Sequence, residues 1–217
     1  MTAAGAELPT SLVEMAEHRL RDSILSGTLR PGDKIVEEDL CAGLGISRGP
    51  LREALRLLTQ QGLVEHLPRR GSRVVQWSTE DIVQLFGLRS VLERHAVESA
   101  FPLSDPKQAL EPVRDALSAM RAARGSLERD DAHRAFHAEV VGLADNRQLD
   151  IALSPILLKL QLPMARNLRE EARRRDTVQE GVARHEELLQ ALESNDRDLI
   201  VAALHAHGHL TYLGLST

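Results

Sequence analysis

The chain has 217 residues, of which 42% are hydrophobic and 27% are charged, a balance typical of globular proteins rather than disordered ones. A net charge of −5, an aromatic content of 2% and a single cysteine, Cys41, exclude a uniformly basic nucleic-acid binder, a base-stacking platform, an intramolecular disulfide and a cysteine zinc site. No run reaches the roughly 20 apolar residues that span a bilayer. Residues 1–9 lack the basic and apolar regions of an export signal, so we expect a cytoplasmic protein that does not enter the membrane.

The first third of the chain predicts short helices followed by a β-hairpin. Apolar spacing, together with glycine and proline residues, predicts three helices and then two strands, at residues 11–26, 37–43, 47–61, 63–67 and 72–76. Ser47 is suited to cap the third helix. This order of elements is that of a winged helix-turn-helix domain, which we place at residues 10–78.

The third predicted helix separates apolar from basic side chains. One face carries Leu51, Ala54, Leu55 and Leu58, and another carries a ridge of Arg48, Arg52 and Arg56. Arginine suits both phosphates and the bidentate recognition of guanine in the major groove. Gly49 leaves room for a close backbone approach, and Arg70 with Gly71 at the hairpin tip offers a second basic contact. The alternative is a solvated arginine face paired with Glu53.

Three stretches of this region resemble the GntR family of bacterial transcription regulators: LRPGDKI at residues 29–35, LGISRGPLREALRLL at 44–58 and GLV at 62–64. The resemblance implies a homodimer bound to double-stranded operator DNA. It also implies that Arg48 and Arg52 contact bases or phosphates, and that the wing around Arg70 enters the minor groove. The predicted DNA-binding residues are therefore Ser47, Arg48, Gly49, Arg52, Arg56, Arg70 and Gly71.

The rest of the chain, residues 79–217, predicts an all-helical bundle of about six helices. A helix capped near Ser78 runs to about residue 100, and further helices are predicted at residues 106–124, 127–143, 146–174, 176–194 and 196–213. Pro155 and Pro163 are expected to break or kink the longest of them. The fold class is therefore mostly α, a winged helix-turn-helix followed by a helical bundle.

Four histidines from three of these helices lie on apolar faces: His133, His137, His185 and His207. Buried neutral imidazoles need partners, and one divalent ion satisfies several of them at once. A histidine pair at i and i+4, joined by histidines from other helices, suits such an ion. Each histidine taken alone is more readily explained as a hydrogen-bonded core residue. Asp130, one turn before His133, is an alternative oxygen ligand.

Residues 79–213 are similar to the FCD effector domain of the FadR-type branch of the GntR family. The similarity rests on Leu88-Arg89 with Glu93, on Phe136-His137 with Asn146, on His185, and on Asp196 with His207. It implies a divalent metal held by one aspartate and three histidines, and a role in dimerisation. His133 stands where the family has the aspartate. An all-imidazole set suits Zn, Ni or Cu better than Mn or Mg, and we expect Zn.

Arg89 shares an apolar helix face and is expected to point inward. It can form an i, i+4 ion pair with Glu93, or its guanidinium can receive the carboxylate of an effector beside the metal. The resemblance implies that such effectors are small organic acids. We therefore predict that Arg89 is an effector-binding residue.

These features together predict a sequence-specific transcriptional repressor whose operator affinity is controlled by a small organic acid bound near a divalent metal. One alternative is a metal-responsive regulator in which the ion itself is the signal. Another is a metallohydrolase, but four protein ligands leave little room at a tetrahedral zinc, and no glutamate stands in place as a base. We therefore do not expect an enzyme.

Overall fold

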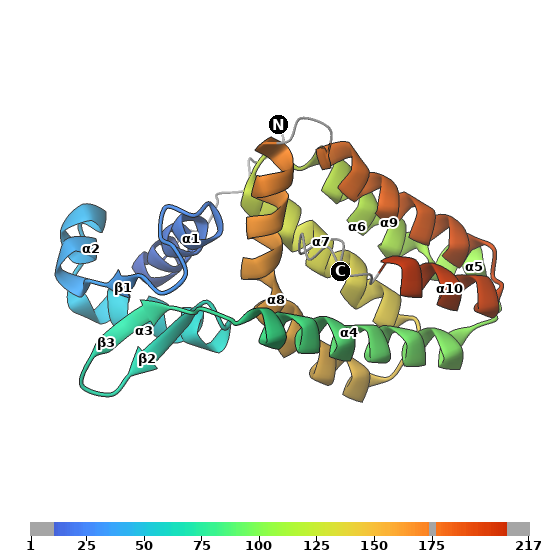
Figure 1. Ribbon diagram of the computed structural model, residues 1–217, viewed down its shortest axis with the longest axis horizontal. Helices are drawn as coiled ribbons and strands as arrows, with labels where there is room; N and C mark the ends of the chain where they lie inside the picture. Colours follow the sequence, from blue (N-terminus) through green and yellow to red (C-terminus); the bar gives the residue numbers. More distant parts are fainter. Residues whose placement is uncertain (1–10, 174–176, 208–217) are drawn as a thin grey trace, which may run out of the picture. The chain divides into compact units, whose positions relative to one another are not determined.

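The computed structural model describes residues 11–173 and 177–207, and these form two compact units (Figure 1). The first unit contains the described residues up to Val75, except Leu25–Gly27, and the second continues from Gln76. Among the described residues, no helix is both long enough and apolar enough to cross a lipid bilayer.

The first unit is a winged helix-turn-helix, which confirms the predicted fold. Its elements are α1 (Leu12–Leu25), β1 (Lys34–Ile35), α2 (Glu37–Leu44), α3 (Arg48–Gln60), β2 (Val64–Leu67) and β3 (Gly71–Val74). The strands form an antiparallel sheet in the order β1-β3-β2. Strand β1 was not predicted, since two residues are too few to show an alternating pattern. Gly45 ends α2 in the left-handed conformation at φ 66°, which glycine adopts without a steric penalty.

The core of this unit follows the apolar face predicted for the third helix. Leu51, Ala54, Leu55 and Leu58 of α3 are buried, and so are Leu20 and Ile24 of α1. Burial of each of these leucines contributes about 1.5–3 kcal/mol. Leu12, the first residue of α1, is 55% exposed and lies outside this core.

The second unit is an all-helical bundle, as predicted. It contains α4 (Thr79–Ala100), α5 (Pro106–Ala109), α6 (Glu111–Ala122), α7 (Ser126–Gly142), α8 (Arg147–Arg173), α9 (Thr177–Glu193) and α10 (Arg197–His207). Helix α4 begins with a capping box between Ser78 and Asp81. Helix α7 lies in the middle of the bundle and packs against α4, α6 and α8 (Figure 1).

One predicted helix is divided in the structure. The helix predicted over residues 106–124 is divided at Leu110, and Pro112 lies in the first turn of α6, where its missing N–H leaves no helical hydrogen bond unmade. The longest helix keeps nearly its predicted range: α8 is one helix, and Pro155 and Pro163 lie inside it without breaking it. Buried leucines such as Leu153 and Leu160 hold α8 in the core on both sides of Pro155.

Candidate functional site

The exposed face of α3 carries the predicted arginine ridge. Arg48, Arg52 and Arg56 are all exposed, on the side of the helix opposite the buried leucines. Ser47 occupies the N-cap position with an extended backbone, but its side chain makes no capping hydrogen bond. A Cβ at Gly49 would meet no atom of this chain within 4 Å. The first turn of α3 is therefore open to a partner.

Two arginines of the ridge already have carboxylate partners. Arg52 Nε lies 2.9 Å from Glu37 Oε2 of α2, and an Arg56 terminal nitrogen lies 2.7 Å from Glu53 Oε1. The second pair is the alternative that the sequence left open. The first was not foreseen, because Glu37 lies fifteen residues away on another helix.

The wing between β2 and β3 is a tight, exposed turn. Arg69 and Gly71 both have positive φ, at 64° and 84°, and the Arg70 N–H donates to the Leu67 carbonyl at 3.0 Å. Arg70 and Gly71 are exposed. A cleft of about 350 Å³ lies between α3 and the hairpin, lined in part by Arg52, Arg56, His66 and Ser72. Helix α3 and the hairpin thus flank one cleft.

The structure brings all four predicted histidines into the interior of the bundle. His133, His137, His185 and His207 are at most 5% exposed. The Nε2 atoms of His133 and His137 are 3.2 Å apart, and those of His137 and His185 are 3.4 Å apart. One donor nitrogen from each of these three residues lies within 4.8 Å of the others. The ring of His207 is near, with its centroid 4.4 Å from that of His185.

These separations fit a divalent metal ion. Ligand nitrogens about 2.0–2.1 Å from a tetrahedral zinc are about 3.3–3.4 Å from each other, which is the spacing found around His137 Nε2. Burial lowers the pKa of His133, His137 and His207 well below their usual range, which favours the neutral form of these three imidazoles. Neutral imidazole is the form that binds metal.

Asp130 does not belong to this group of donors. It is 1% exposed, and its carboxylate lies 3.3 Å from Arg134 Nε of the same helix. His205, two residues before His207, is exposed. His209 lies outside the described residues.

Arg89 points inward and is 2% exposed. Its Nε lies 3.1 Å from Glu93 Oε1, so the ion pair that the sequence allowed is formed. The same carboxylate oxygen lies 2.8 Å from His137 Nδ1. Burial raises the pKa of the Glu93 carboxyl, an effect that the charge of Arg89 opposes. A buried chain of three polar side chains thus connects the predicted effector residue to a predicted metal ligand.

Two residues of this centre had no predicted role there. Glu93 was expected only as a partner of Arg89, and its contact with His137 joins α4 to α7, which the sequence could not align. Arg184 was not considered, although its charge contributes to the lowered pKa of His207. Its position immediately before His185 was a usable signal.

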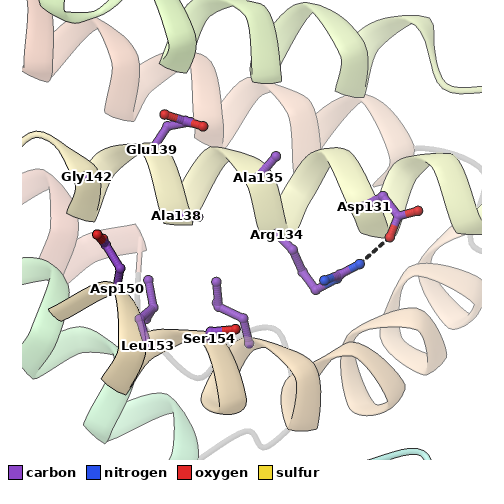
Figure 2. A pocket seen from close by; sticks show the side chains of 10 residues that line it. Asp131, Arg134, Ala135, Ala138, Glu139, Gly142, Asp150, Leu153 and Ser154 are labelled. Carbon is purple, nitrogen blue, oxygen red and sulfur yellow. Dashed lines mark hydrogen bonds and ion pairs between the residues drawn. The ribbon is translucent and has the colours of Figure 1, made fainter. Parts of the chain in front are cut away.

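A separate groove of about 500 Å³ lies between α7 and α8. Figure 2 shows residues that line it, which include Ala135, Ala138 and Gly142 of α7. Arg134 reaches along it to Asp131. None of the four histidines and neither Arg89 nor Glu93 lines this groove, so it is distinct from the histidine cluster.

Comparison with known families gives two matches. The model of the bacterial regulatory proteins of the gntR family matches residues 12–74, and that of the FCD domain matches residues 84–210. Together they span both units of the structure, and the FCD match alone covers more than half of the chain.

Several regulators are similar to this chain. The probable D-xylose utilization operon transcriptional repressor of Paenarthrobacter nicotinovorans is 30% identical, over 85% of this chain and 80% of that protein. The gluconate operon transcriptional repressor of Bacillus subtilis is 25% identical over 87% and 78% of the two chains. The match with the HTH-type transcriptional regulator YdhC of Bacillus subtilis, at 29% identity, spans only 64% of that protein.

A solved structure shares the fold over nearly its whole length. A GntR transcriptional regulator from Rhodococcus sp. RHA1 is 26% identical, with a TM-score of 0.73, over 94% of this chain and 99% of that one. McbR/YncC of E. coli, at 20% identity, has a TM-score of 0.64 and supports the fold alone. The fold and the relatives are those of transcriptional regulators rather than enzymes.

Proposed function

Because this chain belongs to the GntR family of bacterial regulatory proteins and carries an FCD domain, we propose that it is a DNA-binding transcriptional repressor. In this proposal a homodimer binds a pseudo-palindromic operator. A small organic acid, bound near a divalent metal in the second unit, controls operator affinity.

The main evidence for DNA binding is the arginine ridge of α3. In a helix-turn-helix protein, the second helix of the motif enters the major groove and its first residues contact the base edges. Arg48 and Arg52 lie in the first two turns of α3, are exposed, and suit guanine or phosphate. Ser47 and Gly49 add a hydroxyl and a close backbone approach at the same end. Arg56 extends the ridge, and Arg70 with Gly71 contacts the minor groove from the wing.

The proposed metal site is supported by the Nε2 atoms of three histidines, which lie close together. Zinc accepts imidazole ligands in this arrangement, and Ni or Cu are further candidates for an all-histidine set. His133, His137 and His185 would hold the ion, with His207 as the fourth ligand. The ion would supply a Lewis-acidic position for an oxygen atom of the effector.

Arg89 supports the proposal that the effector is an organic acid. Its Nη1 atom is buried and has no hydrogen-bond partner within the described part of the chain. A buried guanidinium nitrogen without a partner is costly, and a carboxylate is the ligand that satisfies it best. An organic acid that binds Arg89 and the ion together would regulate DNA binding to the extent that it favours one conformational state over another.

A metal-responsive regulator is the second candidate. It is favoured by the number of buried imidazoles, since an ion would satisfy them without an organic ligand. If the ion is the signal, changing the zinc concentration alone releases the operator reversibly. If the ion is a cofactor, operator release requires the acid.

Footprinting on the DNA upstream of the protein's own gene and its neighbours tests the proposal. The wild-type protein is expected to protect a pseudo-palindromic site, and Arg52→Ala is expected to lose this protection while remaining folded. Arg197→Ala removes an exposed arginine of α10 and serves as the matched control. Unchanged protection with Arg52→Ala would contradict the assignment of α3 as the recognition helix.

A further inference from the structure

Glu93 makes two contacts through one oxygen atom. Its Oε1 lies 2.8 Å from Nδ1 of His137 and 3.1 Å from Nε of Arg89. All three side chains are at most 3% exposed, so water does not compete for these contacts. Both contacts are ion-pair approaches shielded from solvent, and close charge-assisted contacts of this kind hold side chains in a defined geometry.

The contact with Glu93 decides where the proton of His137 lies. A neutral imidazole carries one proton, and a carboxylate beside Nδ1 keeps it on Nδ1. The lone pair of Nε2 is then free for a metal. This is the atom that lies between the other two donors, 3.2 Å from His133 Nε2 and 3.4 Å from His185 Nε2.

We propose that Glu93 is the positioning residue of the metal site, which fixes the tautomer and ring orientation of His137 and so directs its Nε2 toward a divalent ion. This inference rests on the proposed metal site. It adds a residue from α4 that binds no ion itself and acts through a ligand on α7. Carboxylates that accept a hydrogen bond from a ligating histidine typically raise metal affinity 10–100-fold.

The neighbouring carboxylate distinguishes His137 from His133. The Nδ1 atoms of both rings are buried, but within the described residues only that of His137 forms an ion-pair contact with a carboxylate. Arg89, one turn before Glu93 on α4, holds the carboxylate in place from the other side. The residue that would receive the effector acid and the residue that would hold the metal therefore share one carboxylate oxygen.

Zinc affinity, measured by competition with a chromophoric chelator, tests the proposal. Glu93→Ala removes the acceptor and is expected to weaken zinc binding by about 10–100-fold, and Glu93→Gln, a weaker neutral acceptor, by roughly 10-fold. Glu98→Gln is the matched control, because Glu98 forms an i, i+4 pair with Arg94 on the exposed side of the same helix. Its zinc affinity should stay within about two-fold of the wild type.

The tautomer of His137 is a second measurement. A general loss of stability would not change it. In the metal-free wild-type protein, ¹⁵N NMR of the imidazole rings should show His137 protonated on Nδ1, with its signals identified by their absence in His137→Gln. In Glu93→Ala the two tautomers should be mixed.

Removing Glu93 leaves Arg89 as an unpaired buried charge, which destabilises the fold. The variant Arg89→Gln/Glu93→Gln removes both charges and preserves the side-chain volume at position 93. It should fold and still bind zinc about 10-fold more weakly than the wild type. The proposal for Glu93 is wrong if folded variants lacking its carboxylate bind zinc as the wild type does and keep the Nδ1 tautomer. If the wild type itself binds no metal ion, the metal site of the proposed function fails.

Discussion

Arg52 of α3 forms an ion pair with Glu37 of α2, with 2.9 Å between Nε and Oε2. The pair joins the two helices of the helix-turn-helix and occupies one edge of the guanidinium. The contact uses Nε, and the Arg52 side chain remains 66% exposed. Such a pair between exposed side chains adds little stability, so its importance lies in the orientation of Arg52.

Glu37→Ala is therefore expected to lower specific operator affinity by about 10-fold, since a well-oriented bidentate arginine contributes about 1–3 kcal/mol of base discrimination. Glu38→Ala is a close control, because Glu38 is exposed in the same helical turn and carries the same charge. Both variants remove a negative charge near DNA, so both should bind non-specific DNA slightly more tightly. Equal effects of the two variants on operator affinity, measured by gel shift, would rule out this role for Glu37.

His133 is expected to set the metal preference of the site. His133→Asp replaces an imidazole by a carboxylate, which favours harder ions. The ratio of zinc to manganese affinity should fall by at least about 10-fold in competition titrations. His95→Asp introduces the same change at an exposed position of α4 and should leave the ratio unchanged. A constant ratio in His133→Asp would exclude His133 from the ligand set.

The metal-free protein is expected to lose stability on acidification. Burial lowers the pKa of His133, His137 and His207, so the unfolded chain takes up protons below pH 6.5 that the folded protein does not. Between pH 7.5 and 5.5 each histidine costs up to about 1.4 kcal/mol, or about 4 kcal/mol for the three. The raised pKa of Glu93 acts in the opposite direction, because a carboxyl group that is protonated more readily in the folded state adds stability on acidification.

Urea unfolding in the presence of a chelator measures this loss. His207→Gln should reduce the slope of stability against pH by about one third, and His95→Gln, an exposed position, should not change it. Stability that is constant or rises from pH 7.5 to 5.5 would mean that these histidines are not buried as neutral rings.

Phe136 packs against the histidine cluster in the core of the bundle. It is fully buried, and its ring packs edge-on against His185 at 5.0 Å and against His137 at 5.6 Å between centroids. Phe136→Ala is expected to lower the free energy of unfolding by about 3–5 kcal/mol. Leu199→Ala, at a position 57% exposed in the same unit, should change it by less than about 0.5 kcal/mol. Denaturant titration of the two variants compares these costs, and a similar small loss in both would contradict the burial of Phe136.

The sequence was sufficient to predict features that depend on helical periodicity. The arginine ridge, the buried leucines of α3 and the inward histidines all follow from spacing within one helix. The contacts of Glu37 with Arg52 and of Glu93 with His137 could not be predicted in this way. Each joins two helices, and their relative rotation is decided by packing rather than by local pattern. The division of the helix at Leu110 likewise depends on how Pro112 is accommodated.

Elemental analysis of tag-free protein, purified without chelators, tests most directly whether the buried histidines hold an ion. We expect close to one Zn, Ni or Cu per protomer in the wild type and a large loss of metal in His137→Ala. Metal-free protein that takes up no ion even on reconstitution would contradict the metal site. The histidines would then form the polar lining of a cavity in which Arg89 alone binds the acid.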